Sequence, residues 1–126
     1  MTHPVTGIDH VFLLARDLDD AARRYAALGF TLSPRGLHSA ARGSANHTIM
    51  FPDDYFELLG ILTPTEANLP RRRALETMGE GLHAIACRIA DATEGAAALA
   101  GLGIATTGLG SFERPVPLPG GGTGIA

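Results

Sequence analysis

The feature that most constrains the fold of this chain is an internal repeat. Several features of residues 7–30 recur 73 or 74 positions later, in residues 81–104. Each copy has a histidine in a predicted apolar strand, His10 in the first and His83 in the second. Each also has two acidic residues at a predicted helix start and a glycine at the helix end; these are Asp17, Asp20 and Gly29, and Asp91, Glu94 and Gly103. A repeat of this kind predicts two copies of one structural unit.

The first copy is predicted to have the order strand, helix, strand, strand, strand. Residues 7–14 are β-branched, apolar and aromatic, as is typical of a strand. Acidic residues at 17–20 favour a helix start, and Gly29 favours its end. Further strands are predicted at 30–33, 45–51 and 55–62, and a short helix at 70–78.

The predicted fold class is therefore α+β, built from paired βαβββ modules of which the second is incomplete. We assign residues 1–66 to the first module, 67–80 to a linker with a short helix, and 81–126 to the partial second module. The tail at 119–124 is too glycine-rich to form a firm terminal strand. An uncovered sheet edge invites aggregation. We therefore expect that the chain is part of a longer protein or that a second copy covers the edge in a homodimer.

Composition excludes several classes of function. The net charge of −3 and pI near 5.9 argue against nucleic acid or an anionic membrane as a partner. No lysine is present, which excludes a Schiff-base lysine. The single cysteine, Cys87, cannot form an intrachain disulfide, so a reducing cytoplasm is expected, and its apolar neighbours predict burial. The sequence has no P-loop and no nucleophile elbow.

Three segments, in their order along the chain, resemble the vicinal oxygen chelate superfamily. They are Ile8-Asp9-His10-Val11, Leu28-Gly29-Phe30 and Tyr55-Phe56-Glu57-Leu58-Leu59. The run at 46–51 ahead of 54–59 is similar to the glyoxalase-like domain group of that superfamily, which includes glyoxalases, bleomycin resistance proteins and dioxygenases. The resemblance covers residues 6–62 and, less closely, 81–104.

The resemblance implies a metal site in a cup formed by two modules. It places metal ligands at His10, Glu57 and His83, and a fourth ligand near position 131, beyond the last residue of this chain. Imidazole and carboxylate groups suit a divalent ion such as Zn²⁺, Fe²⁺, Mn²⁺, Ni²⁺ or Co²⁺. Glu57 is the candidate catalytic base, or a ligand. The alternative is a structural His10 that hydrogen-bonds its neighbour Asp9.

Four further residues are candidates for substrate contact: Asn46, His47, Phe12 and Tyr55. His47 alternates with Ile49 and Phe51, so it can equally be a buried histidine on the core side of its strand. His38 lies between Gly36 and Gly43 and is expected to be solvated. The triplet at 71–73 is a solvated basic surface or a cover over an acidic ligand.

Two functions follow from this resemblance. The first is a divalent-metal-dependent enzyme, an isomerase, lyase or dioxygenase, that acts on a small oxygen-rich molecule. The ion would stabilise negative charge that develops on a substrate oxygen. The second is a metal-free protein that binds a small molecule or sequesters an antibiotic between apolar and aromatic walls. Metal content and the separation of His10 from His83 distinguish the two.

Overall fold

A computed structural model describes residues 2–113 and 115–125. The chain divides into two compact units. The larger unit is Thr6–Arg88, and the smaller one combines the residues before Thr6 with the segment from Ile89 onward. Strand β5 of the predicted second module begins within the larger unit.

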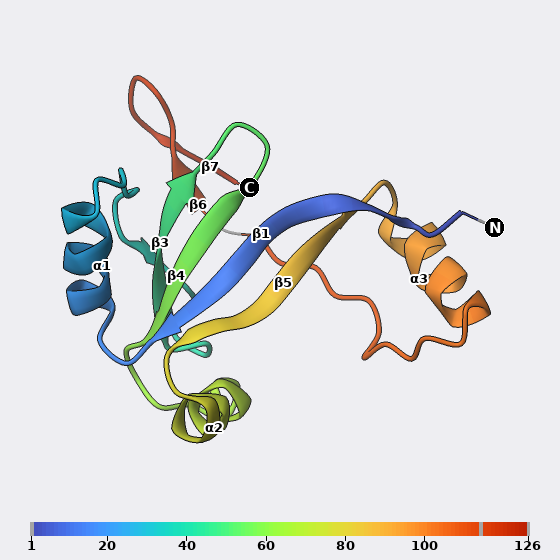
Figure 1. Ribbon diagram of the computed structural model, residues 1–126. Coiled ribbons are helices and arrows are strands. Elements are labelled where there is room, and N and C mark those ends of the chain that lie inside the picture. The colour runs from blue at the N-terminus through green and yellow to red at the C-terminus, as the bar shows by residue number, and fades with distance from the viewer. Residues whose placement is uncertain (1, 114, 126) are drawn as a thin grey trace. The chain divides into compact units, whose positions relative to one another are not determined.

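The larger unit is built on a five-stranded sheet with strand order β2–β3–β4–β1–β5 (Figure 1). Its strands are β1 (Val5–Ala15), β2 (Gly36–Leu37), β3 (Ser44–Met50), β4 (Tyr55–Ile61) and β5 (Gly81–Ile89). Strand β4 pairs parallel to β1 and antiparallel to β3. The predicted α+β fold with a βαβββ module is confirmed.

Three helices lie in the part of the chain that the structure describes. They are α1 (Leu18–Ala27), α2 (Leu69–Met78) and α3 (Ala92–Gly101). Helix α1 lies along one face of the sheet (Figure 1). Within residues 2–113 and 115–125, no helix combines the length and the apolar character that a membrane crossing requires.

The starts of α1 and α3 are capped in the same way. The Asp17 carboxylate accepts a hydrogen bond from the backbone N–H of Asp20 at 2.9 Å. The Asp91 carboxylate accepts one from the backbone N–H of Glu94 at 2.8 Å. In each helix the cap satisfies an N–H group that has no partner inside the first turn. The first acidic residue of each copy therefore caps the N-terminus of its helix.

The ends of α1 and α3 also match. Gly29 and Gly103 have φ values of 98° and 77°, a left-handed conformation in which glycine has no steric penalty. Beyond them, Phe30 N–H donates to the Tyr25 carbonyl at 3.2 Å, and Ile104 N–H donates to the Leu99 carbonyl at 3.0 Å. These donors and acceptors are 74 positions apart in the two copies, so the repeat extends to the capping hydrogen bonds.

The core of the larger unit lies between α1 and the sheet. Leu18 of α1, Ala45 of β3 and Leu58 of β4 form its buried centre. Gly60 of β4 lies against Leu18 of α1, because a Cβ atom there would be 2.6 Å from the Leu18 Cβ. The strand glycine thus permits the helix to pack closely.

The segment predicted as a strand at residues 30–33 is not a strand. Ser33 instead makes two hydrogen bonds with Thr48 of β3: its N–H donates to the Thr48 carbonyl, and its Oγ accepts from the Thr48 N–H, both at 2.8 Å. Pro34 follows and has no N–H to continue a ladder. The strand β2 forms later, where Gly36 pairs with Asn46.

Two other expectations need correction. Cys87 is exposed, whereas its apolar neighbours predicted burial. It lies on β5, which is an edge strand of the sheet. The glycine-rich tail does contribute a short strand, because β7 (Thr123–Ile125) pairs antiparallel with β6 (Pro115–Pro117) in the smaller unit.

Asn68 fixes the start of α2. Its side chain is 1% exposed, and its amide nitrogen donates to the carbonyls of Arg42 and Thr63, each at 2.8 Å. Its amide oxygen accepts from Thr65 N–H at 3.0 Å and from Arg72 Nε at 2.8 Å. One buried side chain therefore ties the helix start to two loops.

Candidate functional site

The strand register divides the side chains of the sheet between two faces. Side chains alternate along a strand, so residues paired across neighbouring strands share a face. We call one face the site face; its members include His10, Phe12 and Leu14 of β1, Tyr55, Glu57 and Leu59 of β4, and Asn46 and Thr48 of β3. The opposite face carries Ala45 and Leu58 and is covered by α1.

His10 is held from three sides. Its Nδ1 lies 2.7 Å from the Asp9 carboxylate. Its ring stacks on Tyr55 at a centroid distance of 4.5 Å, and the ring of Phe12 meets it edge-on at 4.7 Å. These contacts fix the orientation of the imidazole and direct Nε2 along the site face. Phe12 and Tyr55, both predicted to contact substrate, thus lie beside His10.

Glu57 is the buried carboxylate of the site face. It is 7% exposed, and its Oε1 accepts a hydrogen bond from Asn46 Nδ2 at 2.8 Å. Its other oxygen, Oε2, lies 3.5 Å from His10 Nε2. Asn46 is itself buried, so the amide is held where it orients the carboxylate. The predicted residues His10, Glu57 and Asn46 therefore come together.

His38 joins this group, although the sequence predicted it to be solvated. Its side chain is 17% exposed, and its Nε2 lies 3.9 Å from Glu57 Oε1. Its Nδ1 contacts Ser44 Oγ at 2.7 Å, and its N–H donates to the Ser44 carbonyl at 3.0 Å. Because the chain returns from His38 to β3 as a hairpin, the loop histidine is brought over the site face.

The hydrogen bonds of His10 and Glu57 leave two acceptor atoms facing each other. A carboxylate only accepts hydrogen bonds, so the Asp9 contact places the proton of a neutral His10 ring on Nδ1. Nε2 then carries a lone pair, and the Glu57 Oε2 that faces it at 3.5 Å carries negative charge. A proton or a metal cation between them would turn this repulsion into attraction.

His83, the third predicted ligand, is engaged elsewhere. Its Nε2 contacts the Gly79 carbonyl oxygen at 2.6 Å. It lines a cavity together with Phe12, so it lies near His10 without joining the His10–Glu57 pair. Among the residues that the structure describes, no group of three or more His, Cys, Asp or Glu side chains is arranged to hold a metal. The described chain thus brings two predicted donors together.

His47 lies on the helix-covered face. It alternates with Asn46 and Thr48, and its neighbours on that side are Ala45 and Ile49. Its Nδ1 contacts the Ser33 carbonyl at 2.9 Å. The structure therefore separates His47 from the group around Glu57 by the thickness of the sheet.

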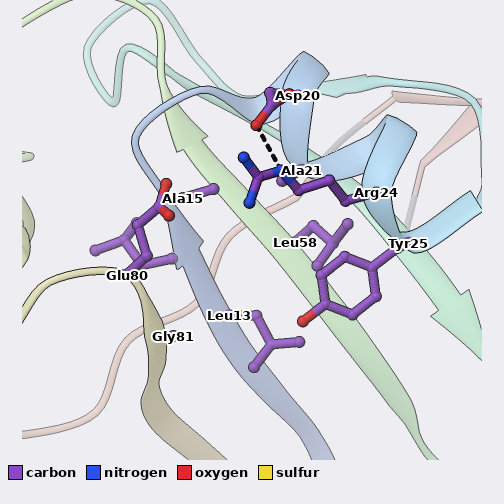
Figure 2. Close-up of a pocket in the computed structure, with 10 residues that line it drawn as sticks. Leu13, Ala15, Asp20, Ala21, Arg24, Tyr25, Leu58, Glu80 and Gly81 are labelled. Atoms are coloured by element: carbon purple, nitrogen blue, oxygen red, sulfur yellow. Dashed lines mark ion pairs between the residues drawn. The ribbon is translucent and has the colours of Figure 1, made fainter. Parts of the chain in front are cut away.

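Two cavities of about 220 Å³ lie in the larger unit, one on each side of the sheet. Figure 2 shows the cavity beside α1, where Tyr25 and Leu58 face each other and Arg24 forms an ion pair with Asp20 at 2.9 Å. The second cavity lies on the site face, between α2 and the strands. Of these two cavities, the second adjoins His10, through Phe12.

Comparison with solved structures supports this arrangement of the sheet. Methylmalonyl-CoA epimerase from Mycobacterium tuberculosis is 25% identical, with a TM-score of 0.65, 92% coverage of this chain and 71% coverage of that chain. A variant of methylmalonyl-CoA epimerase from Streptomyces coelicolor, in complex with 2-nitronate-propionyl-CoA, is 25% identical, with a TM-score of 0.66 and coverages of 94% and 82%. A hypothetical protein from Bacillus halodurans, 19% identical with a TM-score of 0.64 and coverages of 92% and 79%, shares the fold.

The family comparison covers nearly the whole chain. No curated protein sequence matches. The family model described as "Glyoxalase-like domain" matches residues 8–124, which include both copies of the repeat. The resemblance to the vicinal oxygen chelate superfamily is thereby confirmed, and the chain belongs to the glyoxalase-like domain family.

Proposed function

We propose that this protein is a divalent-metal-dependent isomerase that moves a proton on the carbon next to the carbonyl of an acyl thioester. The observation that carries the proposal is the 3.5 Å distance between His10 Nε2 and Glu57 Oε2 on the site face. The similarity to methylmalonyl-CoA epimerases supports an isomerase over a lyase or a dioxygenase.

The donor chemistry of the pair fits a borderline divalent ion. An imidazole nitrogen and a carboxylate oxygen are both ligands for Zn²⁺, Fe²⁺, Mn²⁺, Ni²⁺ and Co²⁺. His10 also has the carboxylate contact behind its ring, through Asp9, that commonly orients a metal-binding histidine. His10 and Glu57 would hold the ion, and a bound ion would act as a Lewis acid toward the substrate carbonyl.

The residues around the pair supply orientation and acid–base chemistry. Asn46 holds Oε1 of Glu57, so Oε2 is the oxygen directed at a ligand or a substrate proton. A carboxylate within reach of the α-carbon can take its proton as a general base. Tyr55 and Phe12 pack against the His10 ring and hold it in this orientation.

The test measures ion binding and proton exchange separately. Isothermal titration with Co²⁺ and Zn²⁺ should show one ion per chain for the wild type and none for His10→Ala, with exposed His3→Ala as the matched control. Exchange of the α-hydrogen of methylmalonyl-CoA in D₂O, followed by NMR, reports isomerase chemistry. Glu57→Gln keeps an oxygen donor without a strong base. Loss of exchange with the ion retained assigns Glu57 as the base, and loss of both assigns it as a ligand.

A metal-free binding protein is the second candidate, and one observation favours it. His83 Nε2 is already bonded to the Gly79 carbonyl, so only two of the three predicted donors meet. A folded wild type that takes up no ion and exchanges no α-hydrogen, but still binds an acyl thioester, would support this candidate and end the isomerase proposal.

A further inference from the structure

The cavity on the site face has an apolar interior. Leu14 and Leu59 are buried and form its floor, and Phe12 and Ala74 contribute its sides. Arg71 of α2 borders it and is exposed to solvent, so its charge lies at the rim and not at the floor. The floor offers a ligand only carbon atoms to contact. Because a polar group loses its hydrogen bonds to water in such surroundings, the cavity favours an apolar group.

The volume of the cavity, about 220 Å³, limits the size of the group that it can hold. An apolar protein cavity of about 150 Å³ accommodates benzene. Pockets that enclose drug-sized ligands have volumes of ~300–1,000 Å³. The cavity therefore suits one apolar group of about four to six carbon atoms, in proportion to the benzene example. It is too small for a whole acyl thioester of coenzyme A.

Glu57 and the floor of the cavity lie on the same face of β4. Side chains two residues apart on a strand point the same way and are separated by roughly 7 Å, so Leu59 is the next site-face residue after Glu57. Across the β1–β4 pair, Phe12 is the register partner of Glu57, and Leu14 is that of Leu59. The cavity floor therefore lies one row of side chains beyond the row that contains the candidate base.

We infer that this cavity binds an apolar substituent on the α-carbon of the acyl group, and that the preferred substituent is a chain longer than methyl. The inference rests on the proposed function, which places the α-carbon at Glu57, and it adds the length of the acyl chain. A methyl group is too short to cross the roughly 7 Å between successive rows of side chains, whereas a chain of about four carbons reaches the leucine floor. The small side chain of Ala74 leaves room for that chain beside α2.

The experiment measures dissociation constants for straight-chain thioesters from propionyl-CoA to hexanoyl-CoA, in which the α-substituent grows from methyl to butyl. Each methylene that enters the cavity should tighten binding roughly 2- to 4-fold, so hexanoyl-CoA should bind roughly 10- to 60-fold more tightly than propionyl-CoA. Ala74→Leu fills the cavity and should remove most of this gain while changing propionyl-CoA less than about 2-fold. Ala84→Leu, at an exposed position of β5 that also lines the cavity, should act in the same way. Ala26→Leu, exposed on α1 and outside the cavity, is the matched control, and thermal melting shows that each variant folds.

The possible outcomes separate this inference from the proposed function. Affinity that rises with chain length and falls in Ala74→Leu, without α-hydrogen exchange on any thioester, supports the apolar subsite and contradicts the isomerase. Exchange on methylmalonyl-CoA together with equal affinities for the whole straight-chain series supports the isomerase and overturns the apolar subsite. The subsite is also overturned if Ala26→Leu reduces the chain-length gain as much as Ala74→Leu does, or if the wild type binds none of the straight-chain thioesters.

Discussion

His10 Nε2 and Glu57 Oε2 lie 3.5 Å apart across the parallel β1–β4 pair. Glu57 is not the register partner of His10, which is Tyr55; it is two residues further along β4, on the same face. The His10 ring therefore stacks on Tyr55, its register partner, while its Nε2 approaches Glu57. This diagonal relationship depends on the orientation of both side chains, and each orientation has its own hydrogen-bond partner.

Asp9 orients His10, and its removal should weaken metal binding. Its carboxylate contacts His10 Nδ1 at 2.7 Å. Loss of such a partner typically costs roughly 10- to 100-fold in metal affinity. We expect Asp9→Ala to raise the Co²⁺ dissociation constant by that factor in isothermal titration, with the fold retained, because Asp9 is only partly buried.

Asp53→Ala is the matched control, since Asp53 is an exposed residue whose backbone carbonyl, not its carboxylate, accepts from Arg88. It should leave the Co²⁺ dissociation constant within about twofold of wild type, as expected for a surface change away from the site. Equal Co²⁺ affinities for Asp9→Ala and wild type would mean that the Asp9 contact does not position the imidazole for an ion.

Asn46 stabilises the protein through Glu57. The amide at 5% exposure donates to the Glu57 carboxylate at 2.8 Å. Asn46→Ala removes that donor from a buried charged group, which should lower the free energy of unfolding by about 1–3 kcal/mol. Urea denaturation measures the change. Met50→Ala, on the same strand and face but 64% exposed, should stay within about 0.5 kcal/mol of wild type. Similar losses in the two variants would contradict this role.

The sequence predicted most of the elements that carry their own local signals. The carboxylate caps of Asp17 and Asp91 and the glycines at 29 and 103 fix the ends of two helices, and both ends form as expected. The alternation of side chains along β3 also predicts which residues can meet Glu57. Asn46 and His47 are adjacent on one strand, so their side chains point to opposite faces, and only Asn46 faces Glu57. Strand periodicity predicts this exclusion without coordinates.

The sequence could not predict contacts that depend on how loops and turns run in the folded protein. His38 lies in a stretch rich in glycine and serine, and nothing in its neighbours indicates that a hairpin returns it to Glu57. The bond of His83 to the Gly79 carbonyl depends on the conformation of the turn before β5. At residues 30–33 a strand was predicted, but Ser33 instead makes two hydrogen bonds to Thr48. Strand propensity does not distinguish such a local pair of bonds from regular strand pairing.

Gly60 should not tolerate a methyl group. A Cβ atom there would lie 2.6 Å from the Leu18 Cβ, at the centre of the contact between α1 and the sheet. We expect Gly60→Ala to lower the free energy of unfolding by about 1–3 kcal/mol through overpacking. Gly7→Ala is the control, because no atom outside its chain neighbours lies within 4 Å of the added group. Urea denaturation should separate the two, and a Gly60→Ala variant as stable as Gly7→Ala would show that α1 can shift freely.

Asn68 should control both the stability of the protein and the hydrogen-exchange protection of α2. Its four side-chain hydrogen bonds join two carbonyls, one N–H and the Arg72 guanidinium at the start of α2. Asn68→Ala leaves the part-buried carbonyls of Arg42 and Thr63 without their side-chain donor, which should lower the free energy of unfolding by about 1–3 kcal/mol. Glu66→Ala, exposed in the same loop, should be close to wild type. Because these bonds hold the start of α2, the variant should also lose hydrogen-exchange protection in α2. If exchange protection in α2 stays at the wild-type level, the helix start is held by contacts other than Asn68.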